Sequence, residues 1–355
     1  MAQIALLDKK TIDQIAAGEV VERPSSVVKE LVENAIDAGA FAISIEIKEG
    51  GRSYIRITDD GCGINPEELP LAFTAHATSK LTKIGDLDTI ASLGFRGEAL
   101  ASIASVSRVE MTTKRPADVT GTRYCVEGGK ETVREEVGAP DGTTIIIRDL
   151  FFNVPARLRF LKTALTEASY VGTYVEQLVL SHPGISFKYI VNGSVKISTS
   201  GNGSLKDVLY RLYGKDLLNE LVPVEAEDKM LGASLSGFIA KPVFCRGNRQ
   251  MESYYVNGRY VKNKVITKAI EDGFGTMLMQ HKYPFSCLFL DIDGERVDVN
   301  VHPAKLEVKF ANEPDLYTFI RNVVAKALAD VNMIIHAKAP EAPAATTTAL
   351  AREAA

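Results

Sequence analysis

The spacing of apolar residues predicts two helices near the start of the chain. A short amphipathic helix is expected from Asp8 to Ala17, and a longer one from Ser26 to Ala38. Ser25 or Ser26 is the expected cap of the longer helix, after Pro24, and Gly39 is its expected stop. The longer helix therefore has two predicted ends and one polar face, which is where catalytic or metal-binding residues would lie.

Directly after this helix the apolar period changes from helical to alternating, which predicts a β-hairpin. Its strands are marked by Ile43, Ile45 and Ile47 and by Ile55 and Ile57, with Gly50-Gly51 as the turn. Four further elements are expected: a glycine-spaced loop entering a helix within 92–108, a strand at 143–147, a helix at 167–180, and a hairpin turned by Asn192-Gly193. Helices and antiparallel strands mixed in this order predict an α+β sandwich of one sheet and one helical layer.

A Gly/Ser-rich stretch at 200–204, followed by a helix expected to end at Gly214, marks the predicted domain boundary. Beyond it we expect a smaller α/β unit with strands near Leu231, Tyr254, Phe285 and Val297, a helix from about Lys264, and a last helix from Leu316 to Val331. From Ala337 the composition is typical of a disordered linker. The predicted division is 1–205, 206–335 and 336–355.

Composition narrows the classes of function. The formal net charge of the 355 residues is −4, so any DNA-binding surface must be a local patch on an acidic background. The four cysteines show no Cys-x-x-Cys spacing, which argues against a disulfide framework or a structural zinc site. Because no signal-peptide pattern or long apolar run is present, we expect a cytoplasmic protein that does not enter a membrane.

Glu30, Asn34 and Asp37 fall on one line along the longer helix, away from its apolar stripe. A solvated polar face would account for this spacing. The functional interpretation is that Glu30 activates a water molecule while Asn34 gives a side-chain oxygen to Mg²⁺. This ion prefers few protein ligands, together with waters and phosphates.

Asp59 shares its strand parity with Ile55 and Ile57, so its carboxylate continues the apolar side of the strand. An unpartnered carboxylate there is costly, and the exocyclic amine of a purine would serve as its partner. Gly61 and Gly63 follow, and glycines allow close approach of the backbone. The alternative is a plain Asp-Gly turn that closes a hairpin.

A glycine-spaced loop enters the next predicted helix with the string Gly94-Phe95-Arg96-Gly97-Glu98-Ala99-Leu100. Such a loop presents free N–H groups to phosphate, although glycines also simply make tight loops. Thr78, Ser79 and Lys80 lie upstream and carry hydroxyls and a cation suited to phosphate oxygens. A surface loop with a helix cap would account for them as well.

In their order along the chain, these motifs resemble those of the GHKL ATPases, which include DNA gyrase B subunits, large heat-shock chaperones, sensor histidine kinases and MutL proteins. The matching pieces are Glu30-x-x-x-Asn34, Asp59-x-Gly61-x-Gly63, the loop from Gly94 to Gly97, and Gly142-Thr143. Longer strings at 14–21, 28–39, 78–80, 94–100 and 299–305 are similar to the MutL family of mismatch-repair proteins. The resemblance spans about 4–331, with no departure at the motif positions.

The resemblance implies a GHKL (Bergerat) ATP-binding α/β sandwich, then a smaller α/β domain like the second domain of ribosomal small-subunit protein five, with a left-handed crossover. It implies that Glu30 is the general base, that Asn34 binds Mg²⁺ and that Asp59 binds the adenine amine. It also implies further ATP contacts, made by Gly61, Gly63, Thr78, Ser79, Lys80, Gly94, Phe95, Arg96, Gly97, Glu98, Ala99, Leu100 and Thr143. Lys305 would reach the γ-phosphate from the second domain, and the first 18 residues resemble an arm that orders on ATP-dependent dimerisation.

Basic residues are concentrated between Lys241 and Lys268, where seven stand against one acidic residue, Glu252. A solvated charged face is one interpretation. With Tyr254, Tyr255 and Tyr260 interleaved, the segment instead favours a groove that tracks DNA phosphates without reading sequence. The residues proposed for single- and double-stranded DNA are Arg259, Lys262, Lys264 and Lys268.

The sequence therefore predicts an ATPase that acts in DNA mismatch repair as an ATP-gated dimeric clamp. The resemblance implies as partners the mismatch sensor MutS and a downstream endonuclease or helicase, close to the nucleoid. The alternative is a nucleotide-gated DNA-binding module in which hydrolysis is incidental. Whether the full-length protein carries a C-terminal endonuclease is not encoded in this chain.

Overall fold

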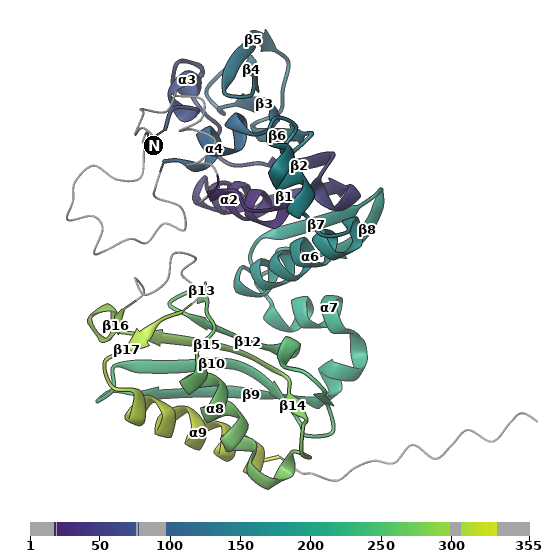
Figure 1. Cartoon of the computed structure of the whole chain (residues 1–355). Coiled ribbons are helices and arrows are strands. Elements are labelled where there is room, and N and C mark those ends of the chain that lie inside the picture. The colour runs from purple at the N-terminus through teal and green to yellow at the C-terminus, as the bar shows by residue number, and fades with distance from the viewer. Residues whose placement is uncertain (1–17, 19, 76, 78–96, 299–306, 332–355) are drawn as a thin grey trace, which may run out of the picture.

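The computed structural model describes residues 18, 20–75, 77, 97–298 and 307–331. It contains two main β-sheets, of eight and five strands, and helices α6 and α7 lie between them (Figure 1). The predicted helix at 8–17, the predicted linker at 336–355 and the proposed dimerisation arm lie outside the described residues. In the described part of the chain, no helix is both long enough and apolar enough to cross a membrane.

The eight-stranded sheet has the order β5-β4-β3-β6-β2-β1-β7-β8, and its pairs are antiparallel except for β1 with β7. The strands are β1 (Ala42–Lys48), β2 (Tyr54–Asp59), β3 (Arg108–Lys114), β4 (Gly121–Glu127), β5 (Lys130–Val137), β6 (Gly142–Arg148), β7 (Ser186–Val191) and β8 (Ser194–Ser198). The helices of this half are α2 (Pro24–Asp37), α3 (Leu69–Ala72), α4 (Ala99–Ser105), α5 (Pro155–Phe160) and α6 (Ala164–Ser181).

Alternation on β1 and β2 explains how the two layers assemble. The isoleucines at odd positions of both strands are buried, while the residues between them are partly exposed. The apolar face of the sheet therefore packs against α2, α4 and α6 in one hydrophobic core. The short 3-10 turn Glu49–Gly51 closes the hairpin, and Gly50 (φ 70°) lies so close to Ala164 that a Cβ would be 2.5 Å from its carbonyl oxygen. The predicted hairpin is confirmed.

The five-stranded sheet has the order β13-β12-β15-β10-β9, with β12 and β15 parallel. Its strands are β9 (Leu221–Asp228), β10 (Ala233–Ala240), β12 (Glu252–Val256), β13 (Arg259–Tyr260) and β15 (Ser286–Ile292). Two short pairs stand apart: β11 (Cys245–Arg246) with β14 (Tyr283–Pro284), and β16 (Val297–Asp298) with β17 (Lys309–Phe310). The handedness implied for the crossover from β12 to β15 stays a prediction.

Each face of this second sheet is covered by helices. One face packs on α8 (Lys264–Phe274) and α9 (Glu313–Ala329), in a core that includes Ile270 and Ile320. From the other face, Tyr255 and Phe285 join the core of the first half, next to α6 and to α7 (Leu205–Glu220). The two sheets are therefore connected by packing as well as by the chain.

One detail differs from the sequence predictions, and two others are confirmed. Helix α2 begins at Pro24 rather than after a serine cap, because the fixed φ of proline suits the first helical position. The first helical segment of α7 ends at Gly214 (φ 82°), as predicted, and a second segment continues from there to Glu220. The strand expected near Leu231 is β10, which begins at Ala233, and Leu231 itself lies in the turn before it.

Candidate functional site

Helix α2 presents the predicted polar residues beside the sheet. Its apolar side, which includes Val28 and Leu31, is buried against the core, whereas Glu30 and Asn34 are only partly buried. The structure thus places both side chains on the accessible side of the helix, which their proposed chemistry requires.

Glu33 is a buried acid on the same helix that the motif analysis missed. It is 7% exposed, and its Oε1 accepts a hydrogen bond from the Tyr174 hydroxyl at 2.7 Å, with Lys29 Nζ at 3.9 Å. Burial raises the pKa of the Glu33 carboxyl, while Lys29 and the Tyr174 bond act in the opposite direction. Because Tyr174 is 141 positions away, no local pattern could have indicated this pair.

Asp59 and Asp60 are neighbours with different environments. Asp59 ends β2, is 9% exposed, and accepts from Gly61 N at 3.0 Å and from the backbone of Thr143, its partner residue on β6. Burial raises the pKa of Asp59. Asp60 is exposed, and its Oδ1 accepts from the backbone N–H groups of Phe41 and Ala42, each at 2.8 Å. Asp59 is thus buried at the end of β2, whereas Asp60 holds the start of β1.

The glycines around Asp59 are held against neighbouring backbone. A Cβ on Gly142 (φ 104°) would lie 2.1 Å from the Asp59 carbonyl oxygen, and one on Gly63 (φ 68°) would lie 2.3 Å from that of Lys114. A Cβ on Gly61 would lie 2.8 Å from the Cβ of Ala38. These contacts explain why the loop contains glycine, and they are more specific than the plain Asp-Gly turn considered above.

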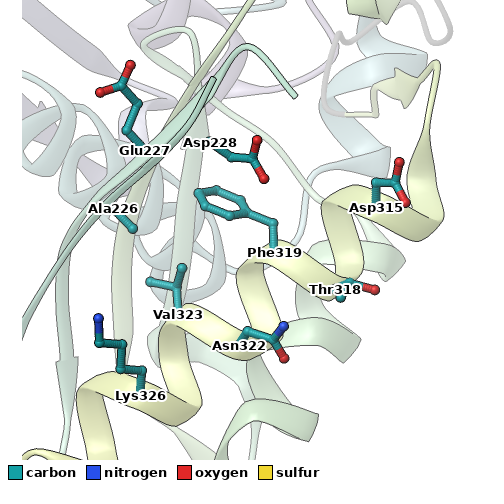
Figure 2. A pocket seen from close by; sticks show the side chains of 9 residues that line it. All are labelled: Ala226, Glu227, Asp228, Asp315, Thr318, Phe319, Asn322, Val323 and Lys326. Atoms are coloured by element: carbon teal, nitrogen blue, oxygen red, sulfur yellow. The ribbon is translucent and has the colours of Figure 1, made fainter. Parts of the chain in front are cut away.

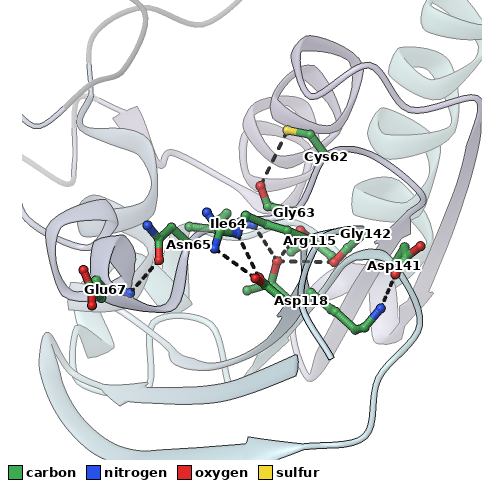
Figure 3. A network of polar contacts seen from close by, with 12 residues as sticks. Cys62, Gly63, Ile64, Asn65, Glu67, Arg115, Asp118, Asp141 and Gly142 are labelled. Atoms are coloured by element: carbon green, nitrogen blue, oxygen red, sulfur yellow. Dashed lines mark hydrogen bonds and ion pairs between the residues drawn. The ribbon is translucent and has the colours of Figure 1, made fainter. Parts of the chain in front are cut away.

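Hydrogen bonds join the loop to both α2 and the sheet, and Figure 3 shows the polar contacts around Ile64 and Gly142. Cys62 N donates to the Ala38 carbonyl at the end of α2 at 3.0 Å, and Ile64 N donates to Thr113 Oγ1 at 3.0 Å. Thr113 Oγ1 is in turn 2.9 Å from Thr143 Oγ1. Thr113 is a second residue that the motif analysis missed, since its role depends on pairing of β3 with β6.

Only part of the predicted phosphate-binding loop can be placed. Gly97 has φ 60°, Glu98 is the N-cap of α4, and that helix begins at Ala99 and includes Leu100. The remaining predicted ATP contacts lie outside the described residues, namely Thr78, Ser79, Lys80, Gly94, Phe95, Arg96 and Lys305.

The basic residues of the segment 241–268 do not all share one environment in the structure. Lys262, Lys264 and Lys268 are exposed, and Arg259 on β13 is partly exposed. Arg249 is engaged elsewhere: it forms a bidentate pair with Glu271 (2.6 and 3.2 Å) and lies over the Tyr283 ring. Lys241 likewise pairs with Glu220, at 3.3 Å.

The interleaved tyrosines do not support the predicted groove that tracks DNA phosphates. Tyr255 is fully buried, with its ring stacked on Phe289 at 4.8 Å, and Tyr254 is also buried. Tyr260 is partly buried, with its ring edge-on to that of Tyr255. Their spacing instead reflects strands that are buried on both faces, so that part of the sequence interpretation is wrong. The exposed lysines are the remaining support for a DNA surface.

A shallow groove between β9 and α9 lies apart from these residues (Figure 2). Phe319 and Val323 form its apolar wall, and Glu227, Asp228 and Asp315 lie along it. Its acidic side chains are unsuited to phosphate, so we assign it no part in nucleotide or DNA binding.

Comparisons with known proteins agree with this geometry. Residues 22–138 match the family of histidine kinase-, DNA gyrase B-, and HSP90-like ATPases, and residues 209–329 match the C-terminal domain family of DNA mismatch repair proteins. A crystal structure of the N-terminal domain of a DNA repair protein superposes with a TM-score of 0.75, covering 90% of this chain and 98% of that one at 24% identity. The Aquifex aeolicus MutL ATPase domain complexed with ADP gives 0.63, covering 89% and 100%, also at 24% identity. The fold is that of a GHKL-type ATPase domain, which confirms the predicted fold class.

The relatives identify the family more narrowly. The MutL mismatch repair protein of Agathobacter rectalis is 54% identical over 98% of this chain and 53% of its own length. That of Caldanaerobacter subterraneus is 49% identical over 95% of this chain and 57% of its own length. The chain belongs to the MutL family of DNA mismatch repair proteins, and it spans about half the length of the curated relatives that it matches.

Proposed function

We propose that this chain binds and hydrolyses ATP, as the N-terminal part of a DNA mismatch-repair protein. The observation that carries the proposal is the position of Asp59. Its buried carboxylate lies at the end of β2 beside Thr143. The loop that follows is hydrogen-bonded to the end of α2, the helix that carries Glu30 and Asn34. Two backbone donors use only part of the acceptor capacity of a carboxylate, and the adenine amine supplies a further donor.

In this proposal Glu30 takes a proton from the water that attacks the γ-phosphorus. A bond forms between that water oxygen and phosphorus, the bond to the bridging oxygen breaks, and ADP leaves. The phosphates are held by backbone N–H groups of 94–100, by Thr78, Ser79 and Lys80, and by Lys305.

The residues of the site fit a magnesium ion. Among the described residues, no cluster of three His, Cys, Asp or Glu side chains could hold a metal. The amide oxygen of Asn34 is a donor that Mg²⁺ accepts, with phosphate oxygens and waters as the other ligands. When bound there, the ion would neutralise phosphate charge.

The further parts of the proposal concern assembly and DNA. We assign 1–205 to the ATPase unit, 206–335 to the second unit and 336–355 to a linker. The first hydrophobic cluster extends past this boundary, to Val208, Leu209 and Leu217 of α7. Arg259, Lys262, Lys264 and Lys268 form the proposed DNA surface. ATP-dependent pairing of two copies would close a clamp around DNA, with MutS and a downstream endonuclease or helicase as partners, in the cytoplasm near the nucleoid.

Nucleotide titration of two variants tests the core of this proposal. Asp59→Asn replaces a carboxylate that accepts from the adenine amine, so ATP affinity should fall by roughly ten- to a hundredfold, the usual worth of a hydrogen bond to a charged group. Asp60→Asn is the matched control, and its affinity should stay within about twofold of wild type. Equal affinities for wild type and Asp59→Asn would remove Asp59 from the nucleotide site.

A further inference from the structure

Helix α6 contacts the polar helix α2 through a buried hydrogen bond, besides apolar packing and the contact of Arg23, the N-cap of α2, with the Tyr170 ring. Tyr174 donates to the buried Glu33 carboxylate at 2.7 Å, and Glu33 lies one helical turn from Glu30 and next to Asn34. Burial raises the pKa of the Tyr174 hydroxyl well above its usual value, and Glu33 and Glu30 raise it further. The hydroxyl is therefore a fixed donor, and it restrains rotation of α2 about its own axis.

The same turn of α6 also holds the second sheet. The fully buried Tyr255 of β12 donates to the carbonyl of Gln177 at 2.9 Å, one helical turn from Tyr174. Between them, Glu176 is hydrogen-bonded to Tyr213 of α7, whose ring meets Phe285 edge-on at 5.5 Å. Three residues of α6, namely Tyr174, Glu176 and Gln177, thus connect it to α2, α7 and β12. Strand β12 comes before the exposed lysines of 262–268 in the chain.

We propose that Tyr174 is a positioning residue for the nucleotide helix, and that residues 174–177 of α6 couple ATP turnover to the DNA-binding unit. This inference rests on the proposed ATPase function. Because α2 is restrained through Glu33, a shift of α6 changes where Glu30 and Asn34 point, and small misplacements of reacting groups reduce rate more than binding. Because α6 is also bonded to β12, DNA bound on the second unit acts on the same turn.

Two substitutions and one matched control test this route. Tyr174→Phe removes the donor to Glu33, and Tyr255→Phe removes the bond between α6 and β12. The control is Tyr189→Phe. Tyr189 of β7 also donates to a carbonyl of α6, at 3.3 Å from the oxygen of Ala168, but both residues belong to the first unit. Steady-state ATP hydrolysis would be measured for each with and without duplex DNA, alongside thermal unfolding.

For Tyr174→Phe we expect kcat to fall about tenfold while KM for ATP stays within twofold. A double-mutant cycle with Glu33→Gln should be strongly non-additive, because the two residues act as one unit. For Tyr255→Phe the rate without DNA should match wild type, while the change of rate caused by DNA should shrink by about fivefold.

The outcomes separate this inference from the function on which it rests. A wild-type chain that neither binds nor hydrolyses ATP would refute the proposed function itself. If wild type hydrolyses ATP but both variants behave like Tyr189→Phe, the ATPase proposal stands and the coupling through α6 is wrong. A wild-type rate that does not respond to DNA would likewise overturn the coupling.

Discussion

The loop after β2 and the basic segment from Lys241 to Lys268 differ in how their sequence signals translate into space. Around the loop, residues far apart in sequence converge: Asp59, Thr113 and Thr143 are linked by backbone pairing and hydrogen bonds. In the basic segment, residues close in sequence diverge. Arg249 pairs with Glu271, and Tyr255 turns into the core. An ordered motif is therefore a stronger guide to a site than a local concentration of charge.

The largest expected effect comes from the tightest glycine packed against the end of β2, which is Gly142 at the start of β6. Gly142→Ala would place a Cβ 2.1 Å from the Asp59 carbonyl oxygen at φ 104°. We expect the free energy of unfolding, measured in urea, to fall by about 3 to 5 kcal/mol through backbone displacement. Gly39→Ala is the control, since Gly39 also has positive φ (74°) but no described heavy atom lies within 4 Å of the added Cβ. It should lose only about 1 kcal/mol, and equal losses for the two variants would contradict the close packing at the end of β2.

The second prediction concerns Glu252, the acidic residue of the basic segment. Glu252 is 7% exposed, and its Oε2 lies 3.9 Å from Arg249 Nε. Burial, and then Glu271, raise the pKa of Glu252 to about 8 in the folded chain, from 4.5 in the unfolded chain. Because the folded pKa is the higher one, the stabilising contribution is complete below pH 4.5 and is lost as the pH rises through 8.

Glu252→Gln should remove this loss of folding stability at high pH, because the amide does not ionise. The unfolding free energy of the variant relative to wild type should rise by roughly 1 to 2 kcal/mol between pH 5 and pH 9, after allowance for screening. Urea titrations at several pH values measure this difference. The same change at the exposed Glu225 serves as a control and should give no such trend. A pH-independent difference for Glu252→Gln would show that its carboxyl titrates normally.

The smallest expected effect tests the exposed lysines. Lys264 is the first residue of α8, where an acidic residue suits the helix dipole, so Lys264→Glu should not weaken the helix. We expect about five- to tenfold weaker DNA binding at low salt, with the salt slope reduced by about 1. Lys196→Glu on β8 makes the same charge change far from the segment along the chain, as a control. Indistinguishable affinities for the two variants would remove Lys264 from the DNA surface.

Local patterns were sufficient for much of the fold. The alternating isoleucines of β1 and β2 and the Asn192-Gly193 turn specify their hairpins without tertiary information. The start of α2 was predicted wrongly, because the fixed φ of Pro24 begins the helix before either serine. The break at Gly214 was predicted correctly. For the candidate site, the order of motifs was enough to bring Asp59 and Thr143 together.

The rest of the site depends on long-range pairing. Glu33 follows Glu30 by one turn and looks like an ordinary polar residue until Tyr174 is placed against it. The burial of Tyr254 and Tyr255 follows from β12 lying inside a sheet covered on both faces, which their spacing alone does not reveal. Such features appear only when the strands and helices are assembled.

The central claim is that α2 carries the chemistry of ATP hydrolysis, and its most direct test is Glu30→Ala. ATP affinity and single-turnover hydrolysis would be measured side by side for the variant and wild type. The account predicts ATP binding within a few-fold of wild type and a loss of turnover of about a hundredfold or more, the usual contribution of a general base. A variant that hydrolyses ATP at the wild-type rate would contradict the account, and the chain would then be a nucleotide-gated DNA-binding module.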